Sequence, residues 1–346
     1  MKVLHVLNSE VYSGAEKVVS QIIKLFADKG GYEMAYCSRE CQTVRDMLRE
    51  QGIPFIAVEE LTPASLRRVI REQKPDVIHA HDMRASFVAA LCCGRIPLVS
   101  HIHNNAYDAR GITVKSVGYL LAGLRARHII WVSQSSYEGY AFHKLFAKKS
   151  SVLYNMIDMD MLLDKLHSDP NTYDYDVIYL GRLTEQKNPQ RLMRVFAKVR
   201  DRKRDVKIAV AGNGELEEQT RHLSEELGLG GTVEFLGFQS NPIKMLSDSR
   251  VMVLTSRWEG TPMCALEAMA LGVCVVSTPA DGMADLIRDG VDGYLSEDDD
   301  VLADRIVSIL EDDALRQTLA GNARRRFEAL NDVENYAKAI EECYRR

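Results

Sequence analysis

Short apolar runs alternate along the chain with segments whose apolar residues recur at helical spacing. The run KVLHVL at 2–7 is typical of a buried strand, and residues 14–29 follow it with Val18, Ile22 and Phe26 on one helical face. Strands that alternate with helices pair in parallel, with helices on both faces of the sheet. The strands predicted in the first half are 2–7, 32–37, 53–58, 76–80, 97–102, 128–133 and 151–155.

The alternation pauses over residues 158–175 and then begins again. This segment is rich in Asp, Ser, Asn and Pro and has little periodicity, so we predict a linker there. Two helices, at about 313–328 and 333–345, are expected to close the chain. The pattern therefore predicts an α/β protein with two Rossmann-like doubly wound parallel-sheet domains. The strands predicted in the second half are 176–181, 206–212, 232–237, 250–256, 273–278 and 294–295.

Length and composition agree with two domains. The chain has 346 residues, and at ~150 residues per domain this is enough for about two cores. A composition of 46% hydrophobic and 27% charged residues excludes a collagen-like, disulfide-rich or disordered chain. The apolar runs are shorter than the ~20 residues that span a bilayer, and polar residues follow Met1 too soon for a signal peptide. We therefore expect a cytoplasmic protein.

Two further features of the composition exclude classes of protein. The seven cysteines form no CxxC pair, which predicts reduced thiols. The formal net charge of −5 gives no reason to expect a nucleic-acid partner.

The predicted strand that ends at Gly181 leads into a cationic loop. Arg182 and Lys187 flank the dipeptide Asn188-Pro189, which resembles a helix cap with proline at the first helical position. Backbone N–H groups, the positive end of a helix dipole and two cations would together form a diphosphate cradle. The alternative is a solvated loop, in which Arg and Lys are common.

A second loop carries two glutamates. Glu259 follows the predicted strand 250–256, and Thr261-Pro262 is typical of a helix start, which puts Glu267 near the beginning of that helix. The N–H groups of residues 263–265 would then lack helical partners and point at an anion. A loop glutamate and a helix glutamate could hold hydroxyl pairs on either side of a diphosphate. The alternatives are an ordinary loop carboxylate and a side chain that complements the helix dipole.

Several stretches of this sequence resemble the motifs of family 4 glycosyltransferases, which have the GT-B fold. In the first half, SGAEKVV at 13–19, HIHNN at 101–105 and VLYNMID at 152–158 resemble the glycine loop, the histidine loop and the inter-domain junction of that family. The resemblance covers most of the chain, and the paired glutamates with the Arg/Lys loop are its most specific part. The matching stretches of the second half are GRLTEQKNPQRLMRVF (181–196), AGNGELEEQ (211–219), VEFLGF (233–238), VLTSRWEGTPMCALEAMALGVCVVST (253–278) and GMADLIRDGVDGYL (282–295).

The resemblance implies a retaining hexosyltransferase that uses a nucleotide-diphosphate sugar, expected to be a UDP-sugar, without a metal ion or other cofactor. The expected acceptor is a glycan or a lipid-linked molecule in cell-surface polysaccharide assembly, with peripheral contact at the inner face of the cell membrane. The resemblance further implies that an acceptor-side domain (1–168) and a donor-binding domain (169–330) face a cleft. The C-terminal helix, within 331–346, would cross back to the first domain.

The resemblance also implies roles for individual residues. Arg182 and Lys187 would bind the pyrophosphate, Glu259 the hydroxyls of the donor sugar, and Glu267 the ribose. His103 would lie across the cleft beside the transferred sugar, and with Glu259, Arg182 and Lys187 it makes up the expected catalytic set. The remaining donor contacts are expected at Gly14, at Gly237 and Phe238 near the base, and at Gly260, Thr261, Pro262 and Met263.

The chemistry of sugar transfer suggests what these groups would do. Breaking a sugar–phosphate bond puts negative charge on the departing diphosphate, and fixed cations stabilise that charge more strongly in the transition state than in the ground state. Retention could use Glu259 as a nucleophile or could proceed by front-side attack. We favour front-side attack with Glu259 positioning the sugar.

Three departures from the family pattern fall in or near the expected site. Ser13 stands before Gly14 where the family usually has a second glycine, so close backbone approach at that position is in question. Met156 replaces a common glycine at the junction. The loop around Glu259 differs from its more common form at Trp258, Thr261 and Met263.

Other patterns allow other interpretations. His79, His81, His101 and His103 have spacings that could hold a metal ion, although strand ends that happen to carry histidine explain them more simply. The run EDDD at 297–300 contains an Asp-x-Asp pattern, which we interpret as a helix start.

Residues 114–127 and 143–149 combine apolar faces with Lys and Arg, which fits either packing helices or contact with an anionic membrane. A nicotinamide-dependent oxidoreductase is disfavoured because the first loop lacks G-x-G-x-x-G. A non-catalytic nucleotide-sugar binding protein and a GT-B-like epimerase remain as alternative functions.

Overall fold

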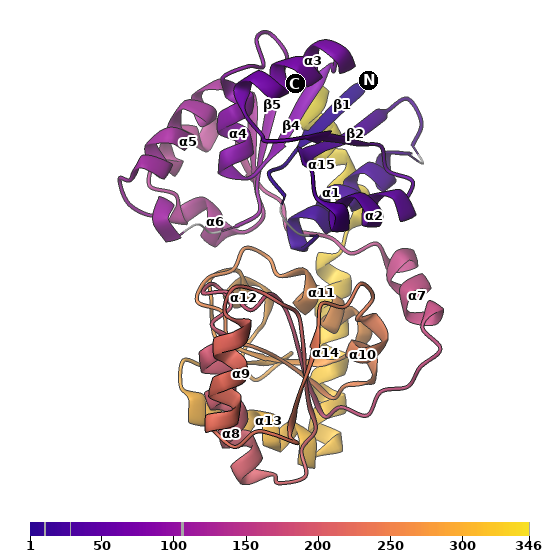
Figure 1. The fold of residues 1–346 in the computed structure, drawn as a ribbon, viewed down its shortest axis with the longest axis vertical. Coiled ribbons are helices and arrows are strands. Elements are labelled where there is room, and N and C mark those ends of the chain that lie inside the picture. Colours follow the sequence, from indigo (N-terminus) through magenta and orange to yellow (C-terminus); the bar gives the residue numbers. More distant parts are fainter. Residues whose placement is uncertain (10–11, 28, 105–106, 346) are drawn as a thin grey trace. The chain divides into compact units, whose positions relative to one another are not determined.

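The computed structural model describes residues 1–9, 12–27, 29–104 and 107–345. It divides into two compact units, the first made of residues 1–156 and 332–346 and the second of residues 157–331. Each unit is a parallel sheet with helices on both faces (Figure 1), as the strand–helix alternation predicts. The seven cysteines all lie in the described part of the chain and form no disulfide.

The first unit holds a seven-stranded sheet in the order β3-β2-β1-β4-β5-β6-β7, all parallel. Its strands are β1 (Lys2–Val6), β2 (Glu33–Arg39), β3 (Phe55–Val58), β4 (Val77–His81), β5 (Leu98–Ile102), β6 (His128–Trp131) and β7 (Ser150–Val152). Its helices are α1 (Gly14–Ala27), α2 (Gln42–Glu50), α3 (Pro63–Gln73), α4 (Asp82–Ala90), α5 (Val114–Arg125), α6 (Gln134–Gly139) and α15 (Val333–Arg345), with 3-10 turns η1 (Tyr107–Ala109) and η2 (His143–Lys149).

The second unit holds a six-stranded parallel sheet in the order β10-β9-β8-β11-β12-β13. Its strands are β8 (Val177–Leu180), β9 (Ile208–Ala211), β10 (Val233–Gly237), β11 (Val251–Leu254), β12 (Cys274–Ser277) and β13 (Tyr294–Leu295). Its helices are α7 (Met159–Ser168), α8 (Pro189–Arg202), α9 (Glu217–Glu226), α10 (Ile243–Asp248), α11 (Met263–Leu271), α12 (Gly282–Leu286), α13 (Asp299–Glu311) and α14 (Asp313–Leu330).

The segment predicted as a linker contains a helix. Asp158 caps α7 by accepting a hydrogen bond from Met161 N at 3.0 Å, and Leu162 is buried. Because α7 packs against α10, it belongs to the second unit, and the division falls at Met156/Ile157 rather than at 168/169. The helix occupies the apolar first part of the segment, and the polar residues at 169–175 made the whole of 158–175 resemble a linker.

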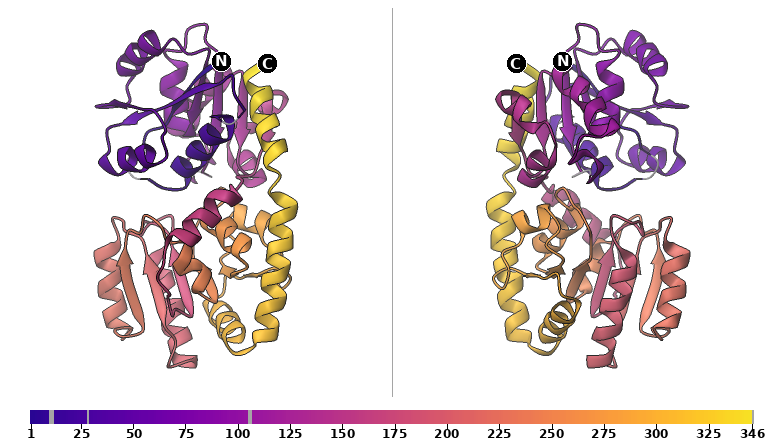
Figure 2. Two further views of the ribbon diagram at one scale, coloured as in Figure 1. Left: turned by 90° about the vertical axis from the view of Figure 1, so that its right-hand side faces the viewer. Right: turned by 90° about the vertical axis from the view of Figure 1, so that its left-hand side faces the viewer.

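The last helix, α15, lies on the first unit beside α1 (Figure 2). Tyr32 donates a hydrogen bond to Glu341 at 2.7 Å, and Tyr344 places its hydroxyl 2.8 Å from His79 Nδ1 in the core. The contacts of Tyr32 and Tyr344 fix the C-terminal helix to the N-terminal fold. Where the chain enters and leaves the second unit, the Asn331 side chain bonds both the N–H and the carbonyl of Ile157, at 2.7 and 2.9 Å.

Candidate active site

In the second unit, the predicted site loops follow two neighbouring strands. The chain places its first strand, β8, beside its fourth, β11, so the strand order reverses direction between them. Loops at the carboxyl ends of two such strands diverge and leave a crevice, which is where ligands of doubly wound sheets bind. The loop after β8 carries Arg182 and Lys187, and the loop after β11 carries Glu259. The structure therefore brings these three predicted residues to one edge of the sheet.

Lys187 and Glu259 are in direct contact. Lys187 Nζ lies 2.5 Å from Glu259 Oε1, and the two side chains are only 12% and 4% exposed. Ser256 donates a second hydrogen bond to the same carboxylate oxygen at 2.6 Å. Charge-assisted hydrogen bonds of this kind are strong and hold both partners in one geometry. The glutamate is thus fixed by a cation and a hydroxyl, both of which approach Oε1.

Further hydrogen bonds join the two loops. Gln186 donates to the carbonyl of Trp258 at 3.0 Å, and its own carbonyl accepts from the N–H of Arg257 at 2.8 Å. The Thr255 hydroxyl bonds the carbonyls of Lys187 and Asn188, at 3.3 and 3.2 Å. These contacts hold the β8 and β11 loops together. Nothing in the sequence indicates that Gln186, Thr255 or Ser256 takes part.

Arg182 lies at the beginning of the β8 loop and is partly exposed. Its carbonyl accepts a hydrogen bond from Tyr179 at 2.8 Å, and its Nη2 lies 3.4 Å from Gln186 Oε1. Helix α8 begins at Pro189, as predicted, with Asn188 at the cap position in the left-handed region at φ 52°. The Asn188 side chain makes no capping hydrogen bond within the described residues, so its part in the cap is conformational.

The second glutamate, Glu267, lies on α11 and is buried, at 6% exposure. Helix α11 begins at Met263 after Pro262, so the predicted helix start is confirmed. One detail is wrong: the N–H of Ala265 is used, because it donates to the carbonyl of Pro262 at 3.1 Å in a tight first turn. Thr261 is also buried, close to the start of the helix.

Two glycines let the backbones of the site loops pack closely. A Cβ at Gly212 would overlap the carbonyl oxygen of Gly181, and φ of Gly212 is +147°. A Cβ at Gly282 would overlap the carbonyl oxygen of Gly260, next to Glu259. Only glycine permits such an approach. Gly212 therefore shapes the loop after β9, and Gly282 is a site residue that the sequence did not single out.

Gly237 and Phe238 lie at the end of β10, two strands away from β8 in the sheet. Gly237 has φ 64°, and its carbonyl accepts from the N–H of Gly212 at 2.8 Å. Phe238 is exposed. An exposed aromatic ring at the carboxyl edge of the sheet can stack on a planar base.

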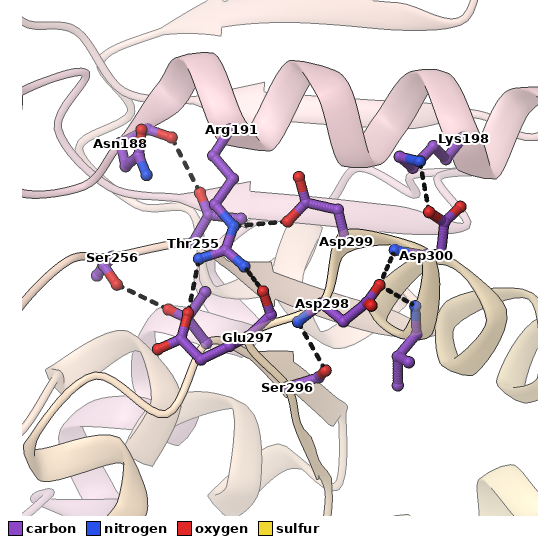
Figure 3. Close-up of polar contacts among 12 residues, drawn as sticks. Asn188, Arg191, Lys198, Thr255, Ser256, Ser296, Glu297, Asp298, Asp299 and Asp300 are labelled. Atoms are coloured by element: carbon purple, nitrogen blue, oxygen red, sulfur yellow. Dashed lines mark hydrogen bonds and ion pairs between the residues drawn. The ribbon is translucent and has the colours of Figure 1, made fainter.

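The acidic run at 297–300 begins a helix, as predicted (Figure 3). Asp298 caps α13 by accepting hydrogen bonds from the N–H groups of Asp300 and Val301 at 2.8 and 3.2 Å. Asp299 pairs with Arg191 at 2.6 Å, and Asp300 pairs with Lys198 at 2.7 Å. These carboxylates tie α13 to α8, and their pairing leaves them poorly suited to hold a divalent ion.

In the first unit, Gly14 is the exposed first residue of α1. Ser13 donates from its N–H and its hydroxyl to the Glu16 carboxylate, at 2.9 and 2.8 Å, so the serine helps to fix the helix start. Burial raises the pKa of Glu16. Met156, which stands where the family commonly has glycine, is also buried.

Five histidines gather in the core of the first unit, at the ends of its central strands. The sheet register sets His5 beside His79 and His81 beside His101, and His103 follows β5. All five are buried, and burial lowers every one of their pKa values, to about 3 for His5 and for His103. The rings are therefore neutral at pH 7, and each carries one ring proton.

Three of these rings form a directional hydrogen-bond chain. His103 Nε2 lies 2.8 Å from His81 Nδ1, and His81 Nε2 lies 3.0 Å from His5 Nδ1. The chain ends where His5 Nε2 lies 3.4 Å from the sulfur of Met34. A thioether can only accept a hydrogen bond, so His5 carries its proton on Nε2. Each preceding ring must then also donate from Nε2, which leaves Nδ1 of His103 as an acceptor.

Two triplets of these histidines have nitrogens within 4.8 Å of one another: His5 with His79 and His81, and His81 with His101 and His103. A metal ion binds histidine through nitrogen lone pairs, which lie in the planes of the rings and must converge on one point. Here the rings of His79 and His81 are stacked with centroids 4.3 Å apart, as are those of His101 and His103 at 4.2 Å. Stacked planes do not converge, so the geometry favours the hydrogen-bond chain over a ligand set.

No helix in the described part of the chain is long and apolar enough to cross a membrane. Two family models match the sequence. The one described as "Glycosyltransferase Family 4" matches residues 12–161, and the one described as "Glycosyl transferases group 1" matches residues 164–326. Together they span both units.

Curated relatives and solved structures agree with these models. The chain is 26% identical to the N-acetylgalactosamine-N,N'-diacetylbacillosaminyl-diphospho-undecaprenol 4-alpha-N-acetylgalactosaminyltransferase of Campylobacter jejuni, over 93% of each chain. It is 23% identical to the UDP-Gal:alpha-D-GlcNAc-diphosphoundecaprenol alpha-1,3-galactosyltransferase of Escherichia coli, over 94% of this chain and 92% of that one. The crystal structure of Anabaena HepE in complex with UDP-glucose superposes with a TM-score of 0.86 at 24% identity, covering 99% and 98% of the two chains.

Proposed function

The chain belongs to glycosyltransferase family 4 and has the GT-B fold, and from this premise we propose that it is a retaining transferase of a hexose from a UDP-sugar to a lipid-linked or glycan acceptor in cell-surface polysaccharide assembly. The relatives from C. jejuni and E. coli are named for sugar transfer to undecaprenol-diphosphate-linked acceptors, which supports this class of acceptor. A lipid-linked acceptor would bring the protein to the inner face of the cell membrane as a peripheral protein.

The observation that carries the proposal is the contact of Lys187 with Glu259 at the switch point of the second sheet, in the loop that also carries Arg182. A cation and a carboxylate in contact can bind opposite parts of one ligand: Lys187, with Arg182, would bind the donor pyrophosphate, and Glu259 the adjoining sugar hydroxyls. Glu267 would hold the ribose. The backbone at Gly260–Met263 would support the sugar and the phosphate, while Gly237 and Phe238 would contact the base and Gly14 the donor from the first unit.

In this proposal the reaction proceeds by front-side attack. The departing diphosphate gains negative charge, and Arg182 and Lys187 stabilise that charge as it develops, without a metal ion or other cofactor. Glu259 positions the sugar, because Lys187 and Ser256 hold its Oε1 and the charge of Lys187 offsets that of the carboxylate, which makes the group a weaker nucleophile. His103, the remaining member of the catalytic set, would accept a hydrogen bond from a sugar hydroxyl through Nδ1.

A thermal-shift screen tests the donor site. UDP-, GDP-, ADP- and dTDP-sugars are added in turn, and bound donor raises stability by RT ln(1 + [L]/Kd). We expect the largest shift with a UDP-sugar. Arg182→Ala/Lys187→Ala should abolish it, while Arg71→Ala/Lys338→Ala, which removes two exposed cations of the first unit, should leave it intact. A full shift in the Arg182/Lys187 variant would show that the donor binds elsewhere.

Acceptor-dependent release of UDP tests the transfer itself. A binding protein would show the thermal shift without release, and an epimerase would convert the donor without an acceptor. Either result would contradict the transferase.

A further inference from the structure

Helix α5 of the first unit buries Tyr119 and three small residues and exposes four large apolar ones. Its buried positions are Ser116, Tyr119, Ala122 and Gly123. Its exposed apolar side chains have between 45% and 93% of their surface accessible, and they are Val114, Val117, Leu121 and Leu124. Their spacing of three, four and three residues forms one stripe along the helix. A surface helix of a globular protein normally has the opposite arrangement, so the stripe is not part of the core.

The helix cannot rotate to bury this stripe. The Tyr119 hydroxyl lies 2.8 Å from the Ser100 hydroxyl in the core, and Tyr140 donates to the carbonyl of Ser116 at 2.8 Å. Thr113 and Ser116 form a capping box at the first turn. Figure 1 shows α5 beside α4 at the edge of the first unit, and the two helices pack together on the buried face of α5.

The exposed apolar surface continues beyond the helix. Ile112 precedes it, and Leu145 lies on η2, which is held against α5 because Phe146 packs on Gly123 and Lys149 Nζ bonds the carbonyls of Leu124 and Ala126 at 3.2 and 2.8 Å. We call these six side chains the apolar patch: Ile112, Val114, Val117, Leu121, Leu124 and Leu145. They make up half of the twelve large hydrophobic side chains that are exposed in the described part of the chain. Such concentration marks an interaction surface.

The charge around the apolar patch indicates what it binds. Residues 108–149 contain seven Lys or Arg, one Asp and one Glu, a formal charge of +5 in a chain whose total is −5. The Asp, Asp108, pairs with Lys115 at 2.9 Å. The basic residues are Arg110, Lys115, Arg125, Arg127, Lys144, Lys148 and Lys149. An apolar stripe flanked by cations fits a bilayer with anionic headgroups. It fits a second copy of this chain poorly, because an isologous contact would set the two positive patches against each other.

We infer that the apolar patch and its basic flank dock the first unit on an anionic bilayer. The apolar side chains would enter the headgroup–acyl boundary while Lys and Arg contact lipid phosphates. This inference extends the proposed function, which supplies the lipid-linked acceptor, by naming the face that meets the membrane. The docking itself needs no donor or acceptor.

Co-sedimentation of the full chain with vesicles tests the inference. Vesicles of phosphatidylglycerol and phosphatidylcholine in equal parts should bind the protein, and phosphatidylcholine vesicles should bind it at least tenfold more weakly. Added salt should release it. Leu121→Glu/Leu124→Glu should weaken binding at least tenfold, and Lys144→Glu/Lys148→Glu should do the same. Val291→Glu/Val301→Glu, at exposed apolar positions of the second unit, is the matched control and should bind as the unaltered chain does.

Three outcomes would overturn the docking surface. They are no binding to anionic vesicles, equal binding by the Leu121/Leu124 variant and its control, and a dimer that this variant dissociates. The thermal shift with UDP-sugars, measured on the same variants, separates the two proposals. A thermal shift with UDP-sugars but no vesicle binding would contradict the docking surface and leave the proposed transferase intact. Vesicle binding without a thermal shift would contradict the proposed donor site and leave the docking surface intact.

Discussion

Lys187 and Glu259 are 72 positions apart in the chain, yet Nζ of the one lies 2.5 Å from Oε1 of the other, at the carboxyl edge of a parallel sheet. The contact couples the stability of the second unit to its proposed donor site. A buried pair is costly to break, because the partner that remains is a charge without a counter-charge.

Lys187→Met should therefore destabilise the protein by about 3 kcal/mol, the low end of the range for breaking a buried pair. Lys187→Met/Glu259→Gln removes both charges and should recover most of that loss. Neither variant should show a thermal shift with a UDP-sugar. Urea unfolding followed by circular dichroism measures both changes. The exposed pair of Arg45 and Glu40 is the control, and Arg45→Met should leave the unfolding midpoint unchanged. A double variant as unstable as Lys187→Met would contradict the coupling.

The five buried histidines should make the protein sensitive to acid. Their pKa values are lowered in the folded chain, to about 3 for His5 and His103, whereas an unfolded histidine titrates near 6.5. Between these values the unfolded state binds more protons, so stability falls as the pH falls below about 6.5. Each of these two histidines should contribute a loss of about 2 kcal/mol between pH 8 and pH 5.

The measurement is the free energy of unfolding at a series of pH values. His79, His81 and His101 act in the same direction, while the raised pKa of Glu16 acts against them. His222→Gln is the control, because that side chain is 72% exposed, and it should not alter the profile. A profile that stays flat from pH 7 to pH 5 would mean that the core histidines are not held neutral.

The hydrogen-bond chain from His103 to Met34 predicts one tautomer for three rings. His103, His81 and His5 should each carry the ring proton on Nε2, because the sulfur at the end of the chain accepts and cannot donate. Long-range proton–nitrogen NMR spectra of histidine-labelled protein report this directly. A proton on Nδ1 of any of the three would reverse the direction of the chain. Met34→Leu keeps the volume but removes the acceptor, and it should cost about 1 kcal/mol of stability.

The strand–helix alternation was sufficient to predict both sheets, because it reflects local periodicity. Helix α7 was missed although Met159, Leu162, Leu163 and Leu166 recur at helical spacing after the Asp158 cap. The Asp, Asn and Pro residues that follow this short helix made the whole segment resemble a linker. The site loops were predicted from residues that follow strand ends, and strand order then explains why Lys187 and Glu259 meet. Strand order is a tertiary property, and a single strand carries no mark of its neighbours.

The histidine cluster shows the same limit. Four of its members stand out by their spacing, but His5 joins them only because β1 pairs with β4 in a register that sets it beside His79. Met34, which orients the chain of rings, lies on β2 and has no signal in the sequence at all. Spacing along the chain thus cannot predict His5 and Met34, because sheet pairing brings them to the cluster.

Gly282 provides a test of the backbone packing beneath the site. A Cβ there would overlap the carbonyl oxygen of Gly260, and backbone cannot move aside as the end of a flexible side chain can. Gly282→Ala should therefore destabilise the protein by about 3 kcal/mol, the upper part of the range for overpacking. It should also weaken donor binding, because the N–H of Gly282 lies 3.4 Å from the carbonyl of Glu259 and the added methyl group displaces that loop.

Gly230→Ala is the matched control, since a Cβ at Gly230 meets no atom within 4 Å and should leave both properties unchanged. Thermal unfolding with and without a UDP-sugar measures the two effects together. If Gly282→Ala lost stability but kept its full donor shift, the loop around Glu259 would tolerate displacement, and the donor sugar would not depend on the position of that carboxylate.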